Sequence, residues 1–458
     1  MIYQDYIGAK MASVPASGLA VDPETEGLFP HQVDLTRWAL RRGRAAIFAD
    51  TGLGKTRMEV VWCDTIYRAV RADSLILAPL AVAPQTVEEA AKIGIQVTHC
   101  MDDADVRPGI NIANYERLHR FNASRFGAVV LDESSCIKHH ETKTLAALIE
   151  AFEDTLYKLC ATATPAPNDW TELGTHAEFL GVRSRAEMLA EFFIHDGAET
   201  QVWRLKGHAR RAFWQWVSSW GAMVRRPSDL GHDDTSYNLP PLSVTQHAVK
   251  GPDQATGMLF AMEAQTLMER RDARRDSISE RVKACAAMVN SDREPWVIWC
   301  DLNAEGDALR AAIPDAVEIR GADSIEEKEK RLDAFAHGKI RVLVTKPSIA
   351  GFGLNWQHCA RMAFVGVTDS FEAYYQAVRR CWRFGQKRPV EVHIFASERE
   401  GAVVANLKRK EHDAIAMGEA LSQETLASVQ ESVLGSAREH NPYIPSARIV
   451  VPSFMEAA

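Results

Sequence analysis

Short apolar runs alternate with helix-like segments along this chain, in two separate stretches. Continuous apolar strands separated by helices are typical of a parallel sheet that is covered on both faces. The expected strands of the first stretch are residues 45–49, 75–78, 110–113, 128–131 and 156–161. Those of the second are residues 296–300, 317–320, 341–345, 362–367 and 390–395. The pattern predicts an α/β protein with two parallel-sheet domains in tandem.

The stretch between these two halves has a different composition. It is helical in pattern, rich in tryptophan, and ends in a loop-like run over residues 231–241. We therefore expect an N-terminal extension (1–27), a first α/β domain (28–171), a helical segment (172–241), a second α/β domain (242–421) and a C-terminal tail (422–458). The tail shows no repeat and no motif.

Length and charge exclude several classes of protein. The 458 residues suffice for two or three domains with ample core, and 53 Lys plus Arg against 61 Asp plus Glu give a net charge of −8. A polycation that coats nucleic acid by bulk charge is excluded, so any nucleic-acid site must be a local patch. The eight scattered cysteines favour reduced thiols in a cytoplasmic protein, and no apolar run is long enough to cross a membrane.

One loop of the first half carries a phosphate-binding pattern. The apolar run 45–49 leads into Asp50-Thr51-Gly52-Leu53-Gly54-Lys55-Thr56, and a helical pattern follows. Glycines let backbone N–H groups wrap phosphates, the helix N-terminus favours anions, and Lys55 would reach the β- and γ-phosphates of ATP. Thr56 would ligate Mg²⁺. Ala49 stands where the general pattern has its first glycine. The alternative is a glycine-rich turn with a chance Gly-Lys-Thr.

An acidic pair follows the apolar run 128–131. A P-loop ATPase needs a carboxylate at the end of a neighbouring strand, so we expect Asp132 to hold Mg²⁺ through water. Glu133 would orient and deprotonate the attacking water. The alternative is a surface acidic pair that caps the next helix.

Seven motifs in a fixed order resemble those of helicase superfamily two, over residues 28–395. They are Phe29-Pro30-His31-Gln32, the run 75–78 with Pro79, Asn114-Tyr115-Glu116, Asp132-Glu133-Ser134-Ser135, Ala161-Thr162-Ala163-Thr164-Pro165, Ala350-Gly351-Phe352-Gly353-Leu354-Asn355 and Gln376-Ala377-Val378-Arg379-Arg380-Cys381-Trp382-Arg383-Phe384-Gly385-Gln386. The last motif is most similar to that of the Swi/Snf-like branch.

The resemblance implies two tandem RecA-like domains and a set of residue roles. Gln32 would read the adenine edge, and Gln376 would lie near the γ-phosphate. Arg380 and Arg383 are three residues apart and share a helix face, so both would reach from the second domain to phosphates on the first. Thr162 and Thr164, in the motif Ala161 to Pro165, would couple nucleotide state to domain movement.

Three departures from the family pattern are visible. The Asp-Glu-Ser-Ser motif lacks the histidine that is common in relatives, so the contact between the domains that the resemblance implies does not carry over with this motif. Ala163 stands where glycine is usual. Cys136, His139 and His140 cluster after the acidic pair, but no fourth metal ligand is evident and a polar loop is the preferred interpretation.

Two basic stretches are candidates for nucleic-acid contact. Residues 200–228 hold no acid, and contain Arg204, Lys206, Arg210, Arg211, Arg225 and Arg226 among Trp203, Phe213, Trp214, Trp216 and Trp220. Cations track phosphates and rings can stack on bases, but we prefer core packing for these rings. In the last motif region Lys387 and Arg388 remain for phosphate contact. The family's nucleic-acid path implies further contacts around Asn114 and from Gly351 to Asn355.

These features favour a DNA-dependent ATPase that uses ATP and Mg²⁺ and translocates on DNA or acts as a helicase. Duplex DNA is the favoured partner because the Swi/Snf-like final motif is present and no wedge domain is evident. The alternatives are a motor subunit of a restriction or repair complex with a partner nuclease, and a nucleotide-binding DNA-recruitment protein without turnover. An RNA-unwinding enzyme is a weaker alternative.

Overall fold

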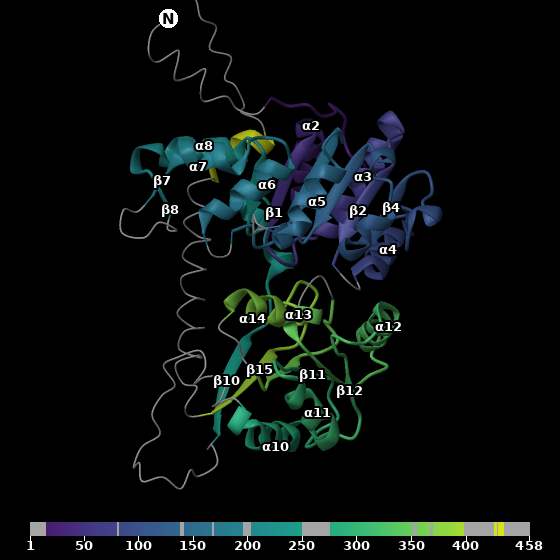
Figure 1. The fold of residues 1–458 in the computed structure, drawn as a ribbon, viewed down its shortest axis with the longest axis vertical. Coiled ribbons are helices and arrows are strands. Elements are labelled where there is room, and N and C mark those ends of the chain that lie inside the picture. The colour runs from purple at the N-terminus through teal and green to yellow at the C-terminus, as the bar shows by residue number, and fades with distance from the viewer. Residues whose placement is uncertain are drawn as a thin grey trace, which may run out of the picture.

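The computed structural model describes residues 15–79, 82–137, 142–166, 169–195, 203–249, 275–350, 355–366, 370–397, 426–427 and 429–434. Two helix-flanked sheets lie one above the other, the first formed by the N-terminal half of the chain and the second by the C-terminal half (Figure 1). The prediction of two parallel-sheet α/β domains is therefore confirmed.

The first sheet is parallel throughout, in the order β3-β4-β2-β5-β6-β1-β9. Its strands are β1 (Arg44–Ala49), β2 (Ser74–Ala78), β3 (Val97–His99), β4 (Ile110–Asn114), β5 (Ala128–Asp132), β6 (Tyr157–Ala161) and β9 (Gly221–Val224). The helices of its first part are α2 (Pro30–Arg42), α3 (Lys55–Val70), α4 (Val82–Lys92) and α5 (Lys143–Ala151). Every residue of β2, β4, β5 and β6 is buried, which explains their unbroken apolar pattern.

The second sheet is also parallel, in the order β10-β15-β14-β11-β13-β12. Its strands are β10 (Leu242–Val249), β11 (Trp296–Trp299), β12 (Ala316–Glu318), β13 (Val342–Thr345), β14 (Arg361–Phe364) and β15 (Val390–Ser397). Its helices are α10 (Ile278–Val289), α11 (Asn303–Ala312), α12 (Ile325–Ala336), α13 (Pro347–Ala350) and α14 (Phe371–Val378). Ser324 caps α12, because its Oγ accepts a hydrogen bond from the Glu327 N–H at 3.2 Å.

The segment between the two sheets belongs to the first domain. It holds α6 (Leu173–Phe179), α7 (Arg185–Phe192), α8 (Arg210–Ser218) and the antiparallel pair β7 (Phe193–His195) and β8 (Trp203–Leu205). The expectation of a separate helical segment is corrected by β9, which pairs in parallel with β1. Trp216 and Trp220 are buried in the same core as the sheet residue Phe48, so the rings of this segment pack rather than stack on bases. Sequence periodicity missed β9 because this strand follows α8 closely, within a stretch whose overall pattern is helical.

Part of the C-terminal tail also returns to the first domain. Val429 and Val433 are buried in its core, and Ser432 Oγ accepts a hydrogen bond from Trp38 Nε1 at 2.8 Å. Gln430 Nε2 donates to the Asp229 carbonyl at 2.8 Å. The described chain therefore begins and ends on the same domain.

All eight cysteines are free, and all of them except Cys136 are buried. Among the described helices, none is long and apolar enough to cross a membrane.

Trp220→Ala should test whether the inter-sheet segment is integral to the first domain. Trp220 is fully buried, so its loss should lower the free energy of unfolding by roughly 3–5 kcal/mol. Gln215→Ala, on the exposed side of α8, is the matched control and should change it by less than about 0.5 kcal/mol. Chemical denaturation measures both. A Trp220→Ala protein as stable as the control would contradict this assignment.

Candidate active site

The glycine-rich loop lies between β1 and α3, at the carboxyl edge of the first sheet. Gly52 and Gly54 have φ angles of 96° and 80°, a region that side chains rarely adopt. A Cβ on Gly54 would lie 2.1 Å from Gln32 Nε2, and one on Gly52 would lie 3.1 Å from the Phe384 backbone nitrogen. Both positions therefore require glycine, so a chance glycine-rich turn is a poor explanation of this loop.

Residues around the loop hold its shape. Lys55 Nζ donates to the Ala49 carbonyl at 3.1 Å, so the lysine spans the loop. Gln32 Nε2 donates to the Leu53 carbonyl at 2.9 Å, and Gln32 Oε1 accepts from the Phe29 N–H at 2.9 Å. Both ends of this amide are thus bonded to backbone, which gives Gln32 a loop-positioning role; adenine reading by Gln32 stays a prediction.

The acidic pair lies where the sequence places it, at the end of β5. Asp132 and Glu133 are 4% and 7% exposed. Burial, together with the charge of Glu133, raises the pKa of Asp132 to about 7. Glu133 has a φ of 49°, a strained backbone conformation for a residue other than glycine. The alternative of a surface acidic pair is wrong because both side chains are buried.

Glu59 is a third carboxylate in this group, and the sequence analysis missed it. It lies on α3 one turn after Lys55, is fully buried, and neither carboxylate oxygen has a hydrogen-bond partner among the described residues. Burial and the charge of Asp132 raise its pKa well above the ordinary value. Its position four residues after Lys55, on the buried face of the P-loop helix, was the available signal. Buried hard oxygen ligands of this kind fit a divalent cation such as Mg²⁺.

An ion pair joins the P-loop to the second domain. Arg379 Nη2 lies 3.1 Å from both carboxylate oxygens of Asp50. Tyr375 Oη donates to Asp50 Oδ1 at 3.0 Å and accepts from Arg379 Nε at 3.1 Å. Burial opposes ionisation of Asp50, but Arg379 and the Thr51 N–H outweigh it and hold the pKa of Asp50 below its ordinary value. We call Asp50, Tyr375 and Arg379 the cleft clasp.

The two arginines carried over from the family pattern lie close to the acidic pair. Arg380 is almost fully buried and donates to Gln376 O at 2.9 Å and to Gln376 Oε1 at 2.8 Å. Burial and the nearby charge of Arg380 lower the pKa of Arg383 to about 9, while Glu133 opposes this shift. Clustered, desolvated guanidinium groups fit an anionic ligand such as a triphosphate.

The threonine motif also contacts the second domain. Thr164 Oγ1 accepts a hydrogen bond from Gln376 Nε2 at 3.3 Å, and the Thr164 N–H donates to Thr162 Oγ1 at 3.2 Å. Ser134 of the acidic motif bonds to His176 Nε2 at 3.1 Å, so a histidine of α6 contacts this motif from within the first domain. Burial lowers the pKa of His176 to about 4 and keeps its ring neutral.

The candidate nucleic-acid residues do not form one surface. Arg210 and Arg211 are exposed on α8, whereas Arg388 Nη1 pairs with Glu294 within the second domain at 2.7 Å and Lys387 lies beside it. Asn114 is buried at the junction of the domains. Gly351 lies outside the described residues, as do His139 and His140 of the Cys136 cluster. Thr51, Leu53 and Thr56 occupy their expected places in the loop and the first turn of α3.

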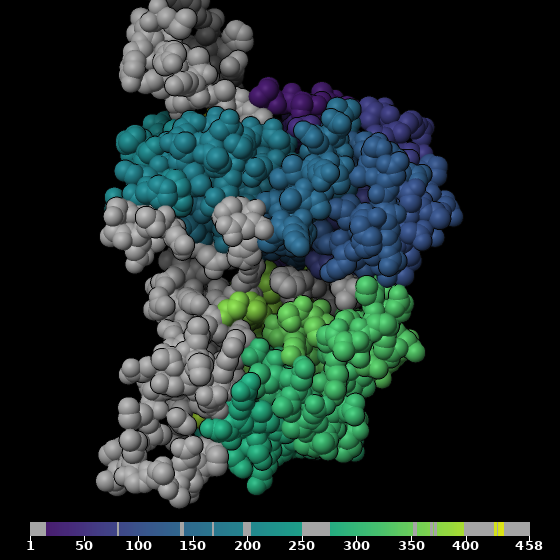
Figure 2. All heavy atoms as spheres, viewed as in Figure 1, coloured from purple at the N-terminus to yellow at the C-terminus, as the bar shows by residue number. Residues whose placement is uncertain are grey.

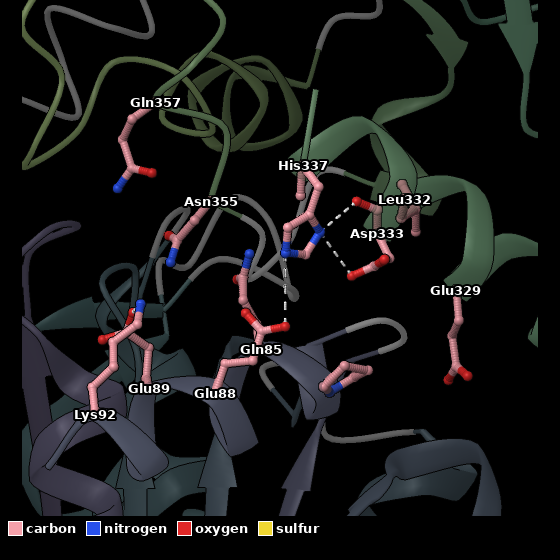
Figure 3. A pocket seen from close by; sticks show the side chains of 12 residues that line it. Gln85, Glu88, Glu89, Lys92, Glu329, Leu332, Asp333, His337, Asn355 and Gln357 are labelled. Atoms are coloured by element: carbon pink, nitrogen blue, oxygen red, sulfur yellow. Dashed lines mark hydrogen bonds and ion pairs between the residues drawn. The ribbon is translucent and has the colours of Figure 1, made fainter. Parts of the chain in front are cut away.

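Asn355 lines a groove between the domains, of about 290 Å³. Its walls come from α4 and α12, with Glu88 and Glu89 on one side and Glu329 and Asp333 on the other (Figure 3). The groove is therefore mostly acidic at its rim, and Lys92 is a positively charged residue of its lining.

Comparison with known proteins finds a family similarity for part of the second half of the chain. Residues 286–385 match the family model of the helicase conserved C-terminal domain. No curated protein matches the chain. The solved SWI2/SNF2 ATPase core of Sulfolobus solfataricus in complex with dsDNA is 18% identical, covers 91% of this chain and 99% of that chain, and has a TM-score of 0.43. The matched residues run from the end of α10 past α14, so this similarity lies within the second domain.

Arg379→Gln should open the cleft in the nucleotide-free protein. Removing one partner leaves Asp50 without its counter-ion, which should destabilise the closed arrangement by on the order of 2 kcal/mol. Small-angle X-ray scattering should then show a larger radius of gyration. Arg341→Gln, which breaks the Arg341–Asp315 pair inside the second domain, is the matched control and should leave the radius unchanged. An unchanged radius in Arg379→Gln would show that the clasp does not hold the domains together.

Proposed function

We propose that this chain, whose second domain carries the helicase conserved C-terminal domain, is an ATP-dependent motor that moves along duplex DNA. The observation that best supports this proposal is the convergence, in one interdomain cleft, of the P-loop lysine, a buried acidic pair and two arginines of the second domain. Such a site would join hydrolysis to domain movement, because its charged groups come from both domains.

The groups of the proposed ATP site can exchange their present hydrogen bonds for bonds to a nucleotide and a cation. Backbone N–H groups of the P-loop and Lys55 would hold the β- and γ-phosphates, in place of the bond from Lys55 to Ala49. Thr56 and Asp132 would hold Mg²⁺. When bound, Mg²⁺ would neutralise phosphate charge and the repulsion among the buried carboxylates. Gln32 would reach the adenine edge by exchanging its bond to Leu53.

Hydrolysis would be carried out from both sides of the cleft. Glu133, with Oε2 buried and unbonded among the described residues, would take a proton from the attacking water. Arg380 and Arg383 would stabilise charge on the transferred phosphoryl group. Gln376 would report the state of the γ-phosphate to Thr164 through their hydrogen bond.

Movement would follow from the clasp and the arginines acting together. ATP would strengthen the closed cleft, and product release would weaken it, so each cycle would shift one domain against the other. We favour duplex DNA because the final motif, Gln376 to Gln386, is most similar to the Swi/Snf-like pattern. Backbone phosphate contacts would permit movement without sequence reading.

Lys55→Ala tests the ATPase part of the proposal. The variant should keep its thermal stability but lose at least about 100-fold in kcat, because a cation that stabilises the transferred phosphoryl group is gone. Lys143→Ala, at an exposed position on α5, is the matched control and should retain full activity. Steady-state phosphate release measures both rates. Unchanged hydrolysis in Lys55→Ala would overturn the proposal, and no hydrolysis by the unmodified protein would favour a recruitment protein without turnover.

A further inference from the structure

Three polar side chains of the first domain lie near one another at the junction with the second domain. Each has an atom without a hydrogen-bond partner among the described residues. His99 ends β3, Asn114 ends β4, and Arg117 follows in the adjoining turn. Asn114 is fully buried and Arg117 is 3% exposed. His99 Nε2, Asn114 Oδ1 and Arg117 Nε are buried and lack hydrogen-bond partners among the described residues. Buried polar atoms without partners are costly, and Arg117 Nε is a donor that an acceptor from outside the first domain would satisfy.

Helix α12 of the second domain presents carboxylates to this cluster. Glu329 Oε1 accepts a hydrogen bond from Asn114 Nδ2 at 3.2 Å, and Glu326 Oε1 lies 3.7 Å from Arg117 Nη2. The two glutamates are three residues apart and therefore share one face of the helix. Burial lowers the pKa of His99, while the nearby charge of Glu329 opposes that shift, so Glu329 also faces the histidine.

The same helix makes a further contact with the first domain at its other end. His337 Nε2 lies 3.9 Å from Glu88 Oε1 of α4, and Figure 3 shows this imidazole between Glu88 and Asp333, with Glu329 further along the helix. The space-filling view shows the two domains touching on the side where α12 lies (Figure 2). The face of α12 that carries Glu326 and Glu329 is thus part of the interdomain contact.

The chemistry of the cluster fits a phosphodiester. Amide N–H, guanidinium and imidazole groups bind anionic oxygens, and a carboxylate offers the same two acceptor oxygens and negative charge as a backbone phosphate. Asn114 ends β4, and the family resemblance predicts nucleic-acid contact at this residue. Glu326 and Glu329 therefore occupy donors that an incoming phosphate requires.

We propose that the acidic face of α12 is an autoinhibitory phosphate mimic: Glu326 and Glu329 cover the anion site of His99, Asn114 and Arg117 until the backbone of nucleic acid displaces them. This inference rests on the proposed function, because it specifies how nucleic acid gains access to the motor. Displacement separates α12 from the first domain and so alters the same cleft in which ATP is bound.

The strength of the contact permits displacement. Glu326 is 68% exposed on its side chain, and an ion pair that water screens contributes little to stability. Several phosphates bound along a duplex release counter-ions and contribute more than this in total. The contact of α12 with the cluster therefore raises the nucleic-acid concentration needed for binding, but it does not prevent binding.

Glu329→Gln tests the mimic directly in the full chain. A fluorescein-labelled duplex of mixed sequence is titrated with nucleotide-free protein, and the Kd is read from fluorescence anisotropy. Glu329→Gln should tighten binding about fivefold, because the competing charge is removed. Glu327→Gln is the matched control: it removes one charge from the same helix, but Glu327 pairs with Arg331 within α12. Its general electrostatic effect on Kd should be much smaller.

Asn114→Ala in the Glu329→Gln background locates the gain. If the phosphate binds at this cluster, the tighter binding of Glu329→Gln should disappear, with thermal melting used to confirm folding. Should Asn114→Ala not fold, Asn114→Ser, which keeps a donor of smaller size, takes its place and should lose most of the gain.

The outcomes separate this inference from the proposed function. Equal Kd values for Glu329→Gln and Glu327→Gln, with duplex binding by the unmodified protein, would overturn the mimic and leave the motor intact. A gain that persists in the Asn114 variants would also overturn it. If neither the unmodified protein nor any variant binds the duplex, the proposed function fails and the inference fails with it.

Discussion

The cleft clasp of Asp50, Tyr375 and Arg379 fixes how the two sheets face one another. Asp50 is the residue between β1 and the P-loop glycines, so the second domain is held at the edge of the sheet where phosphate would bind. Phe384 packs beside Gly52 in the same contact, which leaves no room there for a side chain. Because the clasp sets this spacing, Arg380 and Arg383 lie within reach of Glu133. The other features of the cleft depend on that placement.

Opposite charges gather on the two sides of this cleft. The first domain contributes Glu59, Asp132 and Glu133, all buried, and the second contributes Arg380 and Arg383. Burial, together with repulsion from Glu133, raises the pKa of Asp132, and burial, together with repulsion from Arg380, lowers the pKa of Arg383. A magnesium-bound triphosphate would offset both imbalances at once, its cation among the carboxylates and its phosphates among the guanidinium groups. Strain of this kind is typical of sites prepared for a ligand.

The net charge of −8 includes acidic side chains at the junction of the domains. Glu326 and Glu329 are acids of the second domain that contact donors of the first, so under the proposed mimic part of the negative charge would compete with nucleic acid. The basic residues of α8 face outward at the far edge of the first sheet and do not join that junction. On this proposal, access for DNA would depend on where the acids lie as well as on where the cations lie.

Local patterns predicted the parts of the site that one segment forms by itself. The P-loop and the Asp132–Glu133 pair follow strands whose apolar runs are visible in the sequence, and both lie where those runs end. Glu59 was missed because its burial depends on β5 packing against α3. The partner of Arg379 was missed because Asp50 lies more than 300 residues away in the chain. Strand β9 was missed because it follows α8 closely, and the surrounding stretch has a helical pattern.

The central claim is that this cleft hydrolyses ATP in response to duplex DNA. Steady-state ATP turnover of the full chain, measured alone and with single-stranded DNA, duplex DNA and RNA at one salt concentration, tests it most directly. The account predicts low turnover without nucleic acid and at least about tenfold stimulation by duplex DNA, corresponding to about 1.4 kcal/mol of barrier. Stimulation by RNA alone, or turnover that no nucleic acid changes, would contradict it.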